Sequence, residues 1–478
     1  MRVNKSRKKK KQLNIPIIIV TIFFSVLVVG MSGYIGKYSI SHRQELINNS
    51  YNKRSEILLA QNRRGSIYSH DGEVLAFSQE DEEGNEVRIY PYGPLFSHVV
   101  GYSINGKMGV EANANYYLIN SNAPLSLKAS LDLKEEKYPG DNVYTTLDVT
   151  LQEVASTALG VYKGAVIVTN PKTGEILCMV SKPDFDPNNI ATDWERFVYD
   201  NNSSVLLNRV TQGQYPPGST FKIITALEYI RENPNSYMNY SYNCGGSIKR
   251  GDDRIQCYHG SVHNHVDFEM SFAKSCNTSF TNMGLTFDRD AYGKTLNGLL
   301  FNQKLPVPFL SAVSSLEVDG NTSDSDMMQL SIGQGYASVS PLHLNMITSS
   351  IANHGILMKP YVIDKVVNSE NNTIKEYKPE EFGRLLSEQE AQIMVGLMQG
   401  VVEKGTASRL KGLSYTAAGK TGSAEFGTVK GDSHAWFTGF APVEDPEICV
   451  TIIIEEAGAG GDYAVPIAKR LFDAYFSE

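Results

Sequence analysis

An uncharged, apolar run close to the amino terminus constrains this chain more than any other feature. The segment IPIIIVTIFFSVLVVGMSGYI, from Ile15 to about Ile35, holds no charged residue. About 20 apolar residues in a helix are enough to span the hydrocarbon core of a bilayer. Seven cations and no acid lie within the first eleven residues, and cationic flanks stay cytoplasmic. We therefore predict a basic cytoplasmic tail over residues 1–14, a transmembrane helix over 15–36 and an extracellular location for the rest.

A cleaved signal peptide is the alternative interpretation of the same run, because Gly30 and Ser32 could mimic a cleavage site. The apolar core of a signal peptide usually has only about 7 to 15 residues, however, and this run is longer. We therefore expect an uncleaved, single-pass anchor in the cell membrane.

The composition narrows the class of protein. At 478 residues the chain exceeds the size at which one core stops growing, and 41% apolar with 20% charged residues is typical of globular proteins. Apart from the seven cations at the amino terminus, the chain has 37 Lys and Arg residues and 52 Asp and Glu residues. This remainder has a net charge of −15. Such an acidic body argues against nucleic-acid binding, which requires a basic surface. Five cysteines are too few for a scaffold held together by disulfides.

Two regions follow the apolar run. Residues 37–145 mix polar and apolar positions around a hairpin turn at Asp71-Gly72, and we predict a stalk and a small accessory region there. A larger domain over 146–478 has the apolar segments GAVIVTN and EILCMVS near its start and EICVTIIIEE near its end. Strands at both ends with mostly helical sequence between them predict a mixed α/β domain, an antiparallel sheet flanked by helices.

A serine and a lysine three residues apart form the first candidate catalytic motif. In QYPPGSTFKIITALEYI, Ser219 and Lys222 lie at the start of a helix whose other positions are nearly all apolar. The spacing places both side chains on one face, and burial favours the neutral lysine, which can take a proton from a serine nucleophile. A second Ser-x-x-Lys match, Ser50 and Lys53, lies in the polar stalk. The motif alone is therefore weak, and the apolar helix distinguishes Ser219.

Two further motifs follow Ser219 in the chain. The sequence SCN occupies residues 275–277, 56 positions on, at the junction of two predicted helical pieces. The sequence KTGS occupies residues 420–423, another 145 positions on, before an apolar strand. Decoys of these motifs occur at residues 103–105, 241–243 and 172–174. The ordered set of three, each on a suitable element, indicates one catalytic site.

Together the three motifs resemble those of the penicillin-binding transpeptidase and serine β-lactamase superfamily, which are Ser-x-x-Lys, Ser-x-Asn and Lys-Thr-Gly. Other segments are similar to class B penicillin-binding proteins: RRGSIYSHDGEVLA, TLDVTLQ, NPKTGEILCMVSKPDFDPN, IGQGYASVSPLHL, VVEKGTA and HAWFTGFAP. The short accessory region looks most like the penicillin-binding protein A subgroup. The resemblance, from about residue 63 to the end, implies the fold of this superfamily and D,D-transpeptidase activity on peptidoglycan stem peptides.

The resemblance also implies how the motif residues act. Ser219 would be acylated by the penultimate D-alanine of a stem peptide, with loss of the terminal one, and Lys222 would take the proton of the serine. Ser275 would relay a proton to the leaving amine, Asn277 would hydrogen-bond the substrate peptide, and Lys420 would supply positive potential. The amine of a second stem peptide would then form the cross-link, and β-lactams would acylate the same serine.

Three residues beside Lys420 are implied substrate contacts: Thr421, Gly422 and Ser423. Thr421 and Ser423 would flank the substrate carboxylate, and the backbone amides of Ser219 and Ser423 would form the oxyanion hole. The resemblance implies no cofactor and no metal for this chemistry.

Other functions remain alternatives to the transpeptidase. A D,D-carboxypeptidase would use water as the acceptor, and a β-lactamase would need a deacylating base, for which the sequence offers no assignable residue. Intact motifs disfavour an inactive scaffold of a wall-synthesis complex, and a β-lactam sensor would need a cytoplasmic signalling domain. Residues 37–145 hold no recognisable second catalytic domain, so the family implies a polytopic membrane glycosyltransferase of the shape, elongation, division and sporulation type as a partner. The sequence does not distinguish among roles in cell division, cell shape and sporulation.

A cysteine pair between the first two motifs admits three interpretations. Cys244 and Cys257 bracket the glycine-rich GGSIKRGDDRIQ, and histidines follow at positions 259, 263 and 265. A disulfide is favoured outside the cell, free thiols come next, and irregular ligand spacing disfavours a zinc site. Cys276, in the second motif, is expected to be a small buried hydrophobic residue.

Three polar residues near the carboxyl end are expected to have no catalytic role. His434 lies on the strand after the third motif, and we expect a structural histidine. Glu455 and Glu456 end a later strand, and we expect them to form a solvated rim rather than an acid and base pair.

Overall fold

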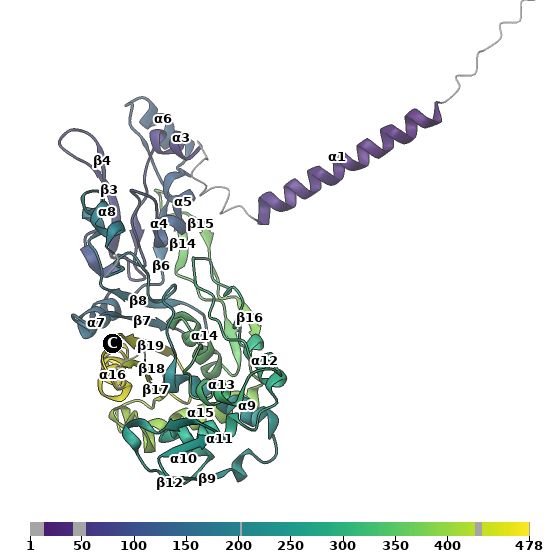
Figure 1. The fold of residues 1–478 in the computed structure, drawn as a ribbon. Helices are drawn as coiled ribbons and strands as arrows, with labels where there is room; N and C mark the ends of the chain where they lie inside the picture. Colours follow the sequence, from purple (N-terminus) through teal and green to yellow (C-terminus); the bar gives the residue numbers. More distant parts are fainter. Residues whose placement is uncertain (1–13, 42–53, 201–202, 426–432, 478) are drawn as a thin grey trace, which may run out of the picture. The chain divides into compact units, whose positions relative to one another are not determined.

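The computed structural model describes residues 14–41, 54–200, 203–425 and 433–477, in two compact units that comprise residues 1–58 and 59–478 (Figure 1). In the first unit the apolar run forms helix α1 (Ile15–Ser41), which continues past the predicted end at residue 36. Its side chains are exposed, Phe23 by 62% and Val29 by 71%. An apolar helix of this length suits a membrane anchor or a signal sequence.

A five-stranded antiparallel sheet forms the centre of the second unit. Its strand order is β17 (Ala418–Glu425), β18 (Ser433–Ala441), β19 (Ile448–Ile454), β7 (Gly164–Thr169) and β8 (Ile176–Lys182). Every residue of β7, β18 and β19 is buried, because helices cover the sheet. Cys449 pairs with Thr169, so the sheet joins segments about 280 residues apart. The predicted antiparallel sheet flanked by helices is confirmed.

Helices from different parts of the chain pack on this sheet. Helices α7 (Val149–Leu159) and α16 (Gly460–Phe476) contact each other and the strands, while α14 (Pro341–Ala352), buried at every residue, packs against β7, β18 and β19 from the other side (Figure 1). Helix α15 (Glu388–Lys404) contacts β17 and α14. The other helices of this part are α9 (Lys222–Glu232), α10 (Phe268–Ala273), α11 (Asn277–Gly284), α12 (Arg289–Gly298) and α13 (Asp324–Leu330).

A second sheet contains the predicted hairpin. Its order is β15 (Thr373–Glu376), β14 (Ile363–Val367), β6 (Asn142–Thr145), β2 (Ile67–Tyr68), β3 (Val74–Glu80) and β4 (Glu86–Ile89). Strands β2 and β3 are antiparallel around Gly72, whose φ of +92° favours glycine. Strand β14 pairs with β6 although more than 200 residues separate them. The predicted boundary at residue 145 assigns β14 and β15 to the larger domain, although both strands belong to this second sheet. The domain boundaries stay a prediction.

Short elements complete the described chain. The remaining strands pair as β1 (Asn62–Arg63) with β5 (Tyr138–Pro139), β9 (Ser241–Cys244) with β12 (Asn264–Asp267), β10 (Ser247–Arg250) with β11 (Asp253–Gln256), and β13 (Ile356–Met358) with β16 (Glu381–Arg384). The remaining helices and 3-10 turns are α3 (Arg54–Gln61), η1 (Gly93–Phe96), α4 (Gly109–Asn113), α5 (Asn115–Ile119), α6 (Leu125–Asp132), η2 (Pro187–Asn189), α8 (Ile190–Tyr199), η3 (Gly218–Phe221), η4 (Tyr237–Asn239), η5 (Tyr258–Gly260) and η6 (Ser408–Leu410).

A buried ion cluster holds the amino-terminal part of the second unit together. The fully buried Glu111 carboxylate accepts hydrogen bonds from Arg64 Nε and Arg88 Nε, each at 2.7 Å, and from the Tyr90 hydroxyl at 3.2 Å. Burial alone raises the pKa of Glu111, but the charges of Arg64 and Arg88 outweigh it and lower this pKa below its ordinary value. The carboxylate therefore stays ionised.

Glu111→Gln is expected to destabilise the protein by about 3 to 5 kcal/mol, because it leaves two buried guanidinium groups without an anion. Urea unfolding of the detergent-solubilised full chain measures this loss. Glu80→Gln is the matched control, since Glu80 pairs with Arg63 at the surface, and such pairs contribute only about 0 to 1 kcal/mol. Equal stability of the two variants would contradict the prediction.

Candidate active site

Ser219 lies on a tight 3-10 turn, η3, that leads directly into helix α9. Gly218 has a φ of +53°, and a Cβ there would come within 2.9 Å of Ala424 on strand β17. Only glycine allows this approach, so the turn packs against the strand. The Ser219 side chain is half-buried, and Lys222 is the first residue of the α-helix.

The Lys222 side chain is fully buried and connects the first two motifs. Its Nζ lies 3.1 Å from Ser219 Oγ and 2.6 Å from Asn277 Oδ1. It also lies 2.8 Å from the backbone oxygen of Ser275 and 3.1 Å from Ser275 Oγ. These contacts aim the amine at the Ser219 hydroxyl and fix it there.

The Ser275 hydroxyl joins the two lysines. Ser275 occupies the bend between α10 and α11 with a φ of +55°, a conformation that is strained for a residue with a side chain. Its Oγ accepts a hydrogen bond from Lys420 Nζ at 2.9 Å. Lys420 is fully buried on β17 and also donates to the Thr421 carbonyl at 3.0 Å. One hydroxyl therefore lies within hydrogen-bonding distance of both amines.

Burial changes the proton affinity of both amines. It lowers the pKa of Lys222 to about 8, although Cys276 and Cys257 partly oppose the shift. Burial, and then the charge of Lys222, lowers the pKa of Lys420 well below its ordinary value. Two ammonium groups this close repel each other in a desolvated site. We therefore expect the pair to carry at most a single positive charge near neutral pH.

The third motif runs beside the turn that carries Ser219. A Cβ on Gly422 would come within 3.0 Å of Thr220 and 3.1 Å of Pro217, so the strand and the turn are in close contact. The Thr421 hydroxyl lies 2.5 Å from the hydroxyl of Thr406, and Ser423 Oγ accepts a weak hydrogen bond from Gly460 N at 3.4 Å. The structure thus brings all eight predicted site residues to one place, and their roles stay a prediction.

Several neighbours of the site have no role in the sequence-based prediction. The Gly333 carbonyl accepts from Gly218 N at 2.8 Å, and Trp436 Nε1 donates to the Pro216 carbonyl at 3.1 Å. Thr406 is the third such neighbour. Their segments IGQG, VVEKGTA and HAWFTG are recognisable in the sequence, but only tertiary contacts reveal that they hold the motifs in place.

Aromatic rings enclose the two amines. The ring of Phe280 lies 5.5 Å from Lys222 Nζ, and that of Phe272 lies 5.7 Å from Lys420 Nζ. The apolar positions around the second motif are the sequence signal for these rings. They are part of the surroundings that bury the two amines, and this burial lowers the pKa of each lysine.

One expectation about the polar residues near the carboxyl end is wrong. Glu455 is not part of a solvated rim: its Oε1 accepts from Arg209 Nε at 2.7 Å and from the Tyr215 hydroxyl at 2.8 Å. His434 Nδ1 accepts from the backbone amide of Glu456 at 3.1 Å, as suits a structural histidine. Sequence position at a strand end did not reveal the partners that cover Glu455.

The disulfide interpretation of the cysteine pair is also wrong. Cys244 Sγ and Cys257 Sγ are 3.7 Å apart, whereas a disulfide requires about 2.05 Å. Both side chains are buried, and neither takes part in a disulfide.

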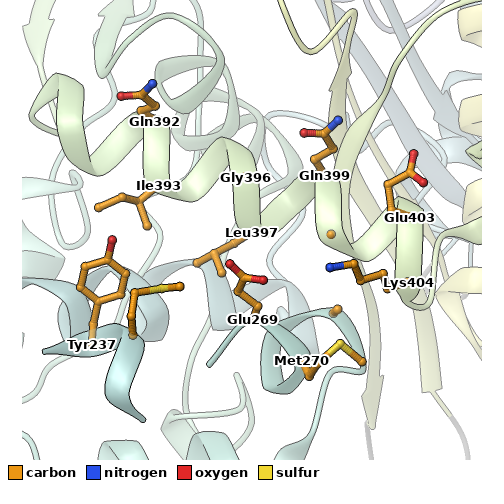
Figure 2. A pocket seen from close by; sticks show the side chains of 13 residues that line it. Tyr237, Glu269, Met270, Gln392, Ile393, Gly396, Leu397, Gln399, Glu403 and Lys404 are labelled. Atoms are coloured by element: carbon orange, nitrogen blue, oxygen red, sulfur yellow. The ribbon is translucent and has the colours of Figure 1, made fainter. Parts of the chain in front are cut away.

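A surface hollow between η4, α10 and α15 is separate from these residues (Figure 2). Tyr237, Glu269, Ile393 and Lys404 are among the residues that line it, and none of the predicted site residues does. The site described above therefore does not depend on it.

Comparison with known proteins agrees with this geometry. Residues 164–473 match the penicillin-binding protein transpeptidase domain, and residues 64–143 match the penicillin-binding protein A dimerisation domain. The peptidoglycan D,D-transpeptidase PbpA of Mycolicibacterium smegmatis is 30% identical over 443 residues, 87% of this chain and 89% of its own length. The peptidoglycan D,D-transpeptidase MrdA of Acinetobacter baumannii is 29% identical over 82% of this chain and 66% of its own.

A solved structure shows the same fold. The imipenem acyl-enzyme complex of penicillin-binding protein A from M. tuberculosis superposes with a TM-score of 0.79 at 28% identity, covering 87% of this chain and 99% of that one. The match includes both the sheet domain and the amino-terminal domain. The chain therefore belongs to the class B penicillin-binding protein transpeptidases, as the resemblance of its motifs and other segments predicted.

Proposed function

We propose that this chain carries out the peptidoglycan D,D-transpeptidation of its family through an acyl-enzyme on Ser219. The observation that carries the proposal is the fully buried Lys222 amine, 3.1 Å from Ser219 Oγ and anchored by Asn277 and Ser275. A desolvated amine with a pKa near 8 can accept the serine proton at physiological pH. A related protein supports acylation by β-lactams, since penicillin-binding protein A of M. tuberculosis forms an imipenem acyl-enzyme.

The first half-reaction transfers the donor stem peptide to the enzyme. Ser219 Oγ attacks the carbonyl carbon of the penultimate D-alanine while Lys222 takes its proton. The bond to the terminal D-alanine then breaks, and the leaving amine receives a proton through the Ser275 hydroxyl, which lies within 3.1 Å of both lysine amines. The terminal D-alanine departs and the ester remains.

The substrate is held by the second and third motifs in this proposal. Asn277 binds the peptide backbone, and Thr421, Gly422 and Ser423 line the path of its terminal carboxylate. Positive charge on the lysine pair attracts that carboxylate. The backbone amides of Ser219 and Ser423, on adjoining elements, stabilise the developing oxyanion.

The second half-reaction reverses these roles. The amine of a second stem peptide attacks the ester carbonyl, loses a proton to Lys222 and forms the cross-link as Ser219 is released. Water in place of the amine gives the D,D-carboxypeptidase reaction, and the same site serves both.

Product analysis with the full-length protein tests the proposal. A donor stem peptide ending in D-alanyl-D-alanine is incubated with and without an acceptor amine, and mass spectrometry follows released D-alanine, cross-linked product and the Ser219 peptide. We expect a cross-link only with the acceptor. Hydrolysis alone in both reactions would favour the carboxypeptidase, and no acylation of Ser219 would contradict both.

The pH dependence of acylation follows from the pKa of Lys222. Only the neutral amine acts as the base, so the acylation rate is expected to rise with pH and to level off above about pH 8. At about pH 6 only ~1% of Lys222 is neutral, and the rate should lie about 100-fold below its plateau. Fluorescent penicillin labelling over this range measures the rate, corrected for hydrolysis of the free reagent. A flat profile would contradict Lys222 as the base.

The location of the enzyme is part of the proposal. Helix α1 acts as a single membrane span with the basic tail in the cytoplasm, so that the catalytic domain faces the cell wall. Glycan strands then come from a polytopic membrane glycosyltransferase of the shape, elongation, division and sporulation type. Copurification from membranes of the full chain, with a variant lacking residues 1–41 as control, tests the association. Failure of the full chain to recover any such polymerase would count against this partner.

A further inference from the structure

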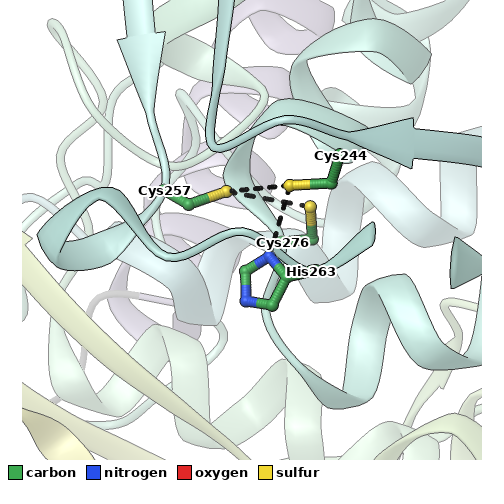
Figure 3. A group of neighbouring side chains, drawn as sticks. All are labelled: Cys244, Cys257, His263 and Cys276. Carbon is green, nitrogen blue, oxygen red and sulfur yellow. Dashed lines mark hydrogen bonds between the residues drawn. The ribbon is translucent and has the colours of Figure 1, made fainter. Parts of the chain in front are cut away.

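Three cysteines and one histidine converge beside the second motif (Figure 3). Cys244 ends strand β9, Cys257 follows β11, His263 precedes β12 and Cys276 precedes α11. Their three Sγ atoms and one imidazole nitrogen all lie within 4.8 Å of one another. Four side chains from four separate segments thus converge on one centre.

The distances match the edges of a small tetrahedron. Cys257 Sγ lies 3.7 Å from Cys244 Sγ and 3.8 Å from Cys276 Sγ, and His263 Nδ1 lies 3.5 Å from Cys244 Sγ. Around tetrahedral Zn²⁺, with Zn–S near 2.3 Å and Zn–N near 2.0 to 2.1 Å, sulfurs stand about 3.8 Å apart and sulfur to nitrogen about 3.5 Å. Three of the six edges are therefore already at metal-ligand spacing, and the other three are at most 4.8 Å long.

The surroundings suit a closed site. The three cysteines are at most 2% exposed, while His263 is half-buried and closes the outer side. Thr278 Oγ1 donates to Cys244 Sγ at 3.2 Å and lies 3.4 Å from Cys276 Sγ. Hydroxyl groups that donate to sulfur ligands orient them and stabilise their thiolate form.

Neither alternative state of the thiols accounts for this arrangement. A disulfide between any two cysteines uses one pair, and it leaves a third buried thiol and His263 aimed at the same point. Three thiols this close, on a domain outside the cell, are also prone to oxidation. A bound metal accounts for all four side chains and protects the sulfurs.

We propose that Cys244, Cys257, Cys276 and His263 bind one Zn²⁺ ion as a structural Cys₃His site. Three thiols release their protons to solvent as three Zn–S bonds and one Zn–Nδ1 bond form, and the site keeps one net negative charge. All four positions of the ion are taken by protein, so it does not take part in the acyl-transfer chemistry.

The ion connects a flap, which we define as residues 244–263, to the second motif. Residues 244–263 include the β10–β11 hairpin, and Asn277 Nδ2 donates to the Gln256 carbonyl, next to Cys257, at 2.8 Å. Cys276 stands between Ser275 and Asn277, both of which contact Lys222. Zinc at Cys276 therefore holds the second motif and the flap in one position, independently of whether Ser219 is acylated.

Metal analysis of the detergent-solubilised full chain, purified without chelators, tests the site. We expect about one zinc per chain in the wild type, and a loss of most of it in Cys244→Ala/Cys257→Ala and in His263→Ala. His265→Ala is the matched control for the histidine, because His265 is exposed and its Nδ1 faces Asn243. Cys178→Ala/Cys449→Ala removes the other two cysteines, which lie in the central sheet, and should keep the zinc.

X-ray absorption spectroscopy of the wild type measures the zinc ligands directly, so it tests the site even if a ligand variant does not fold. Three sulfurs near 2.3 Å and one nitrogen near 2.0 to 2.1 Å are expected. Ser219→Ala should retain the zinc, which separates this site from the acyl-transfer chemistry. Wild-type protein without stoichiometric zinc, or with a disulfide between any two of the three cysteines, would overturn the proposal.

Discussion

Ser219→Ala is expected to abolish covalent labelling by penicillin. The acyl bond forms at Ser219 Oγ, and no neighbouring group replaces it: the Thr220 hydroxyl is buried and donates to the Pro217 carbonyl at 2.7 Å. The half-buried Ser219 side chain makes only a small contribution to packing, so the variant should fold. Labelling with fluorescent penicillin, followed by gel electrophoresis and mass spectrometry, measures the effect.

Ser50→Ala is the matched control for this experiment, because it removes the serine of a Ser-x-x-Lys match that lies far from Ser219 in the sequence. It should label at the wild-type rate. Label that persists on Ser219→Ala would show that another residue is the nucleophile and would contradict the proposed mechanism.

Lys222→Met is expected to slow acylation of Ser219 by about 10² to 10⁴-fold, the usual contribution of a positioned general base. Methionine is close to lysine in length and fills the same buried space, but it cannot accept a proton. It also lacks the hydrogen bonds to Asn277 and Ser275. The fold should survive, because replacing a buried charged group by an apolar side chain is often neutral or stabilising.

The measurement is the second-order rate constant for fluorescent penicillin, with thermal unfolding as a check on folding. Lys172→Met, at the lysine of the Lys-Thr-Gly decoy, is the control, since Lys172 pairs with Asp445 at the surface. It should keep the wild-type rate. A Lys222→Met rate within about tenfold of wild type would assign the base to another group, with Lys420 the next candidate.

The local features of this chain could be predicted from the sequence alone. The uncharged run predicted helix α1, the Asp71-Gly72 pair predicted the β2–β3 hairpin, and apolar segments at both ends of the larger domain predicted the antiparallel sheet. Each depends on periodicity, charge or turn chemistry within a few consecutive residues. The motif around Ser219 is of the same kind, since its helix is apolar on nearly every position.

Features that depend on distant segments were missed or mistaken. Strand β14 pairs with β6 across more than 200 residues and brings β15 into the same sheet, which no local pattern indicates. Glu455 ends a strand like many solvated residues, but Arg209 and Tyr215 cover it. Cys276 is buried as expected, but its Sγ lies 3.8 Å from Cys257 Sγ, and the irregular spacing of these residues in the sequence did not reveal this contact.

By itself, the sequence determined the class of the protein and predicted the residues of its site, because each motif is a short run of consecutive residues. Only the tertiary structure decided how those residues are arranged: which amine faces Ser219, that one hydroxyl lies between both lysines, and that four thiol and imidazole groups meet beside the second motif. The physical reason is that pKa values, hydrogen bonds and ligand geometry depend on burial and on distances of a few ångströms. Those distances are set by packing between elements far apart in the chain.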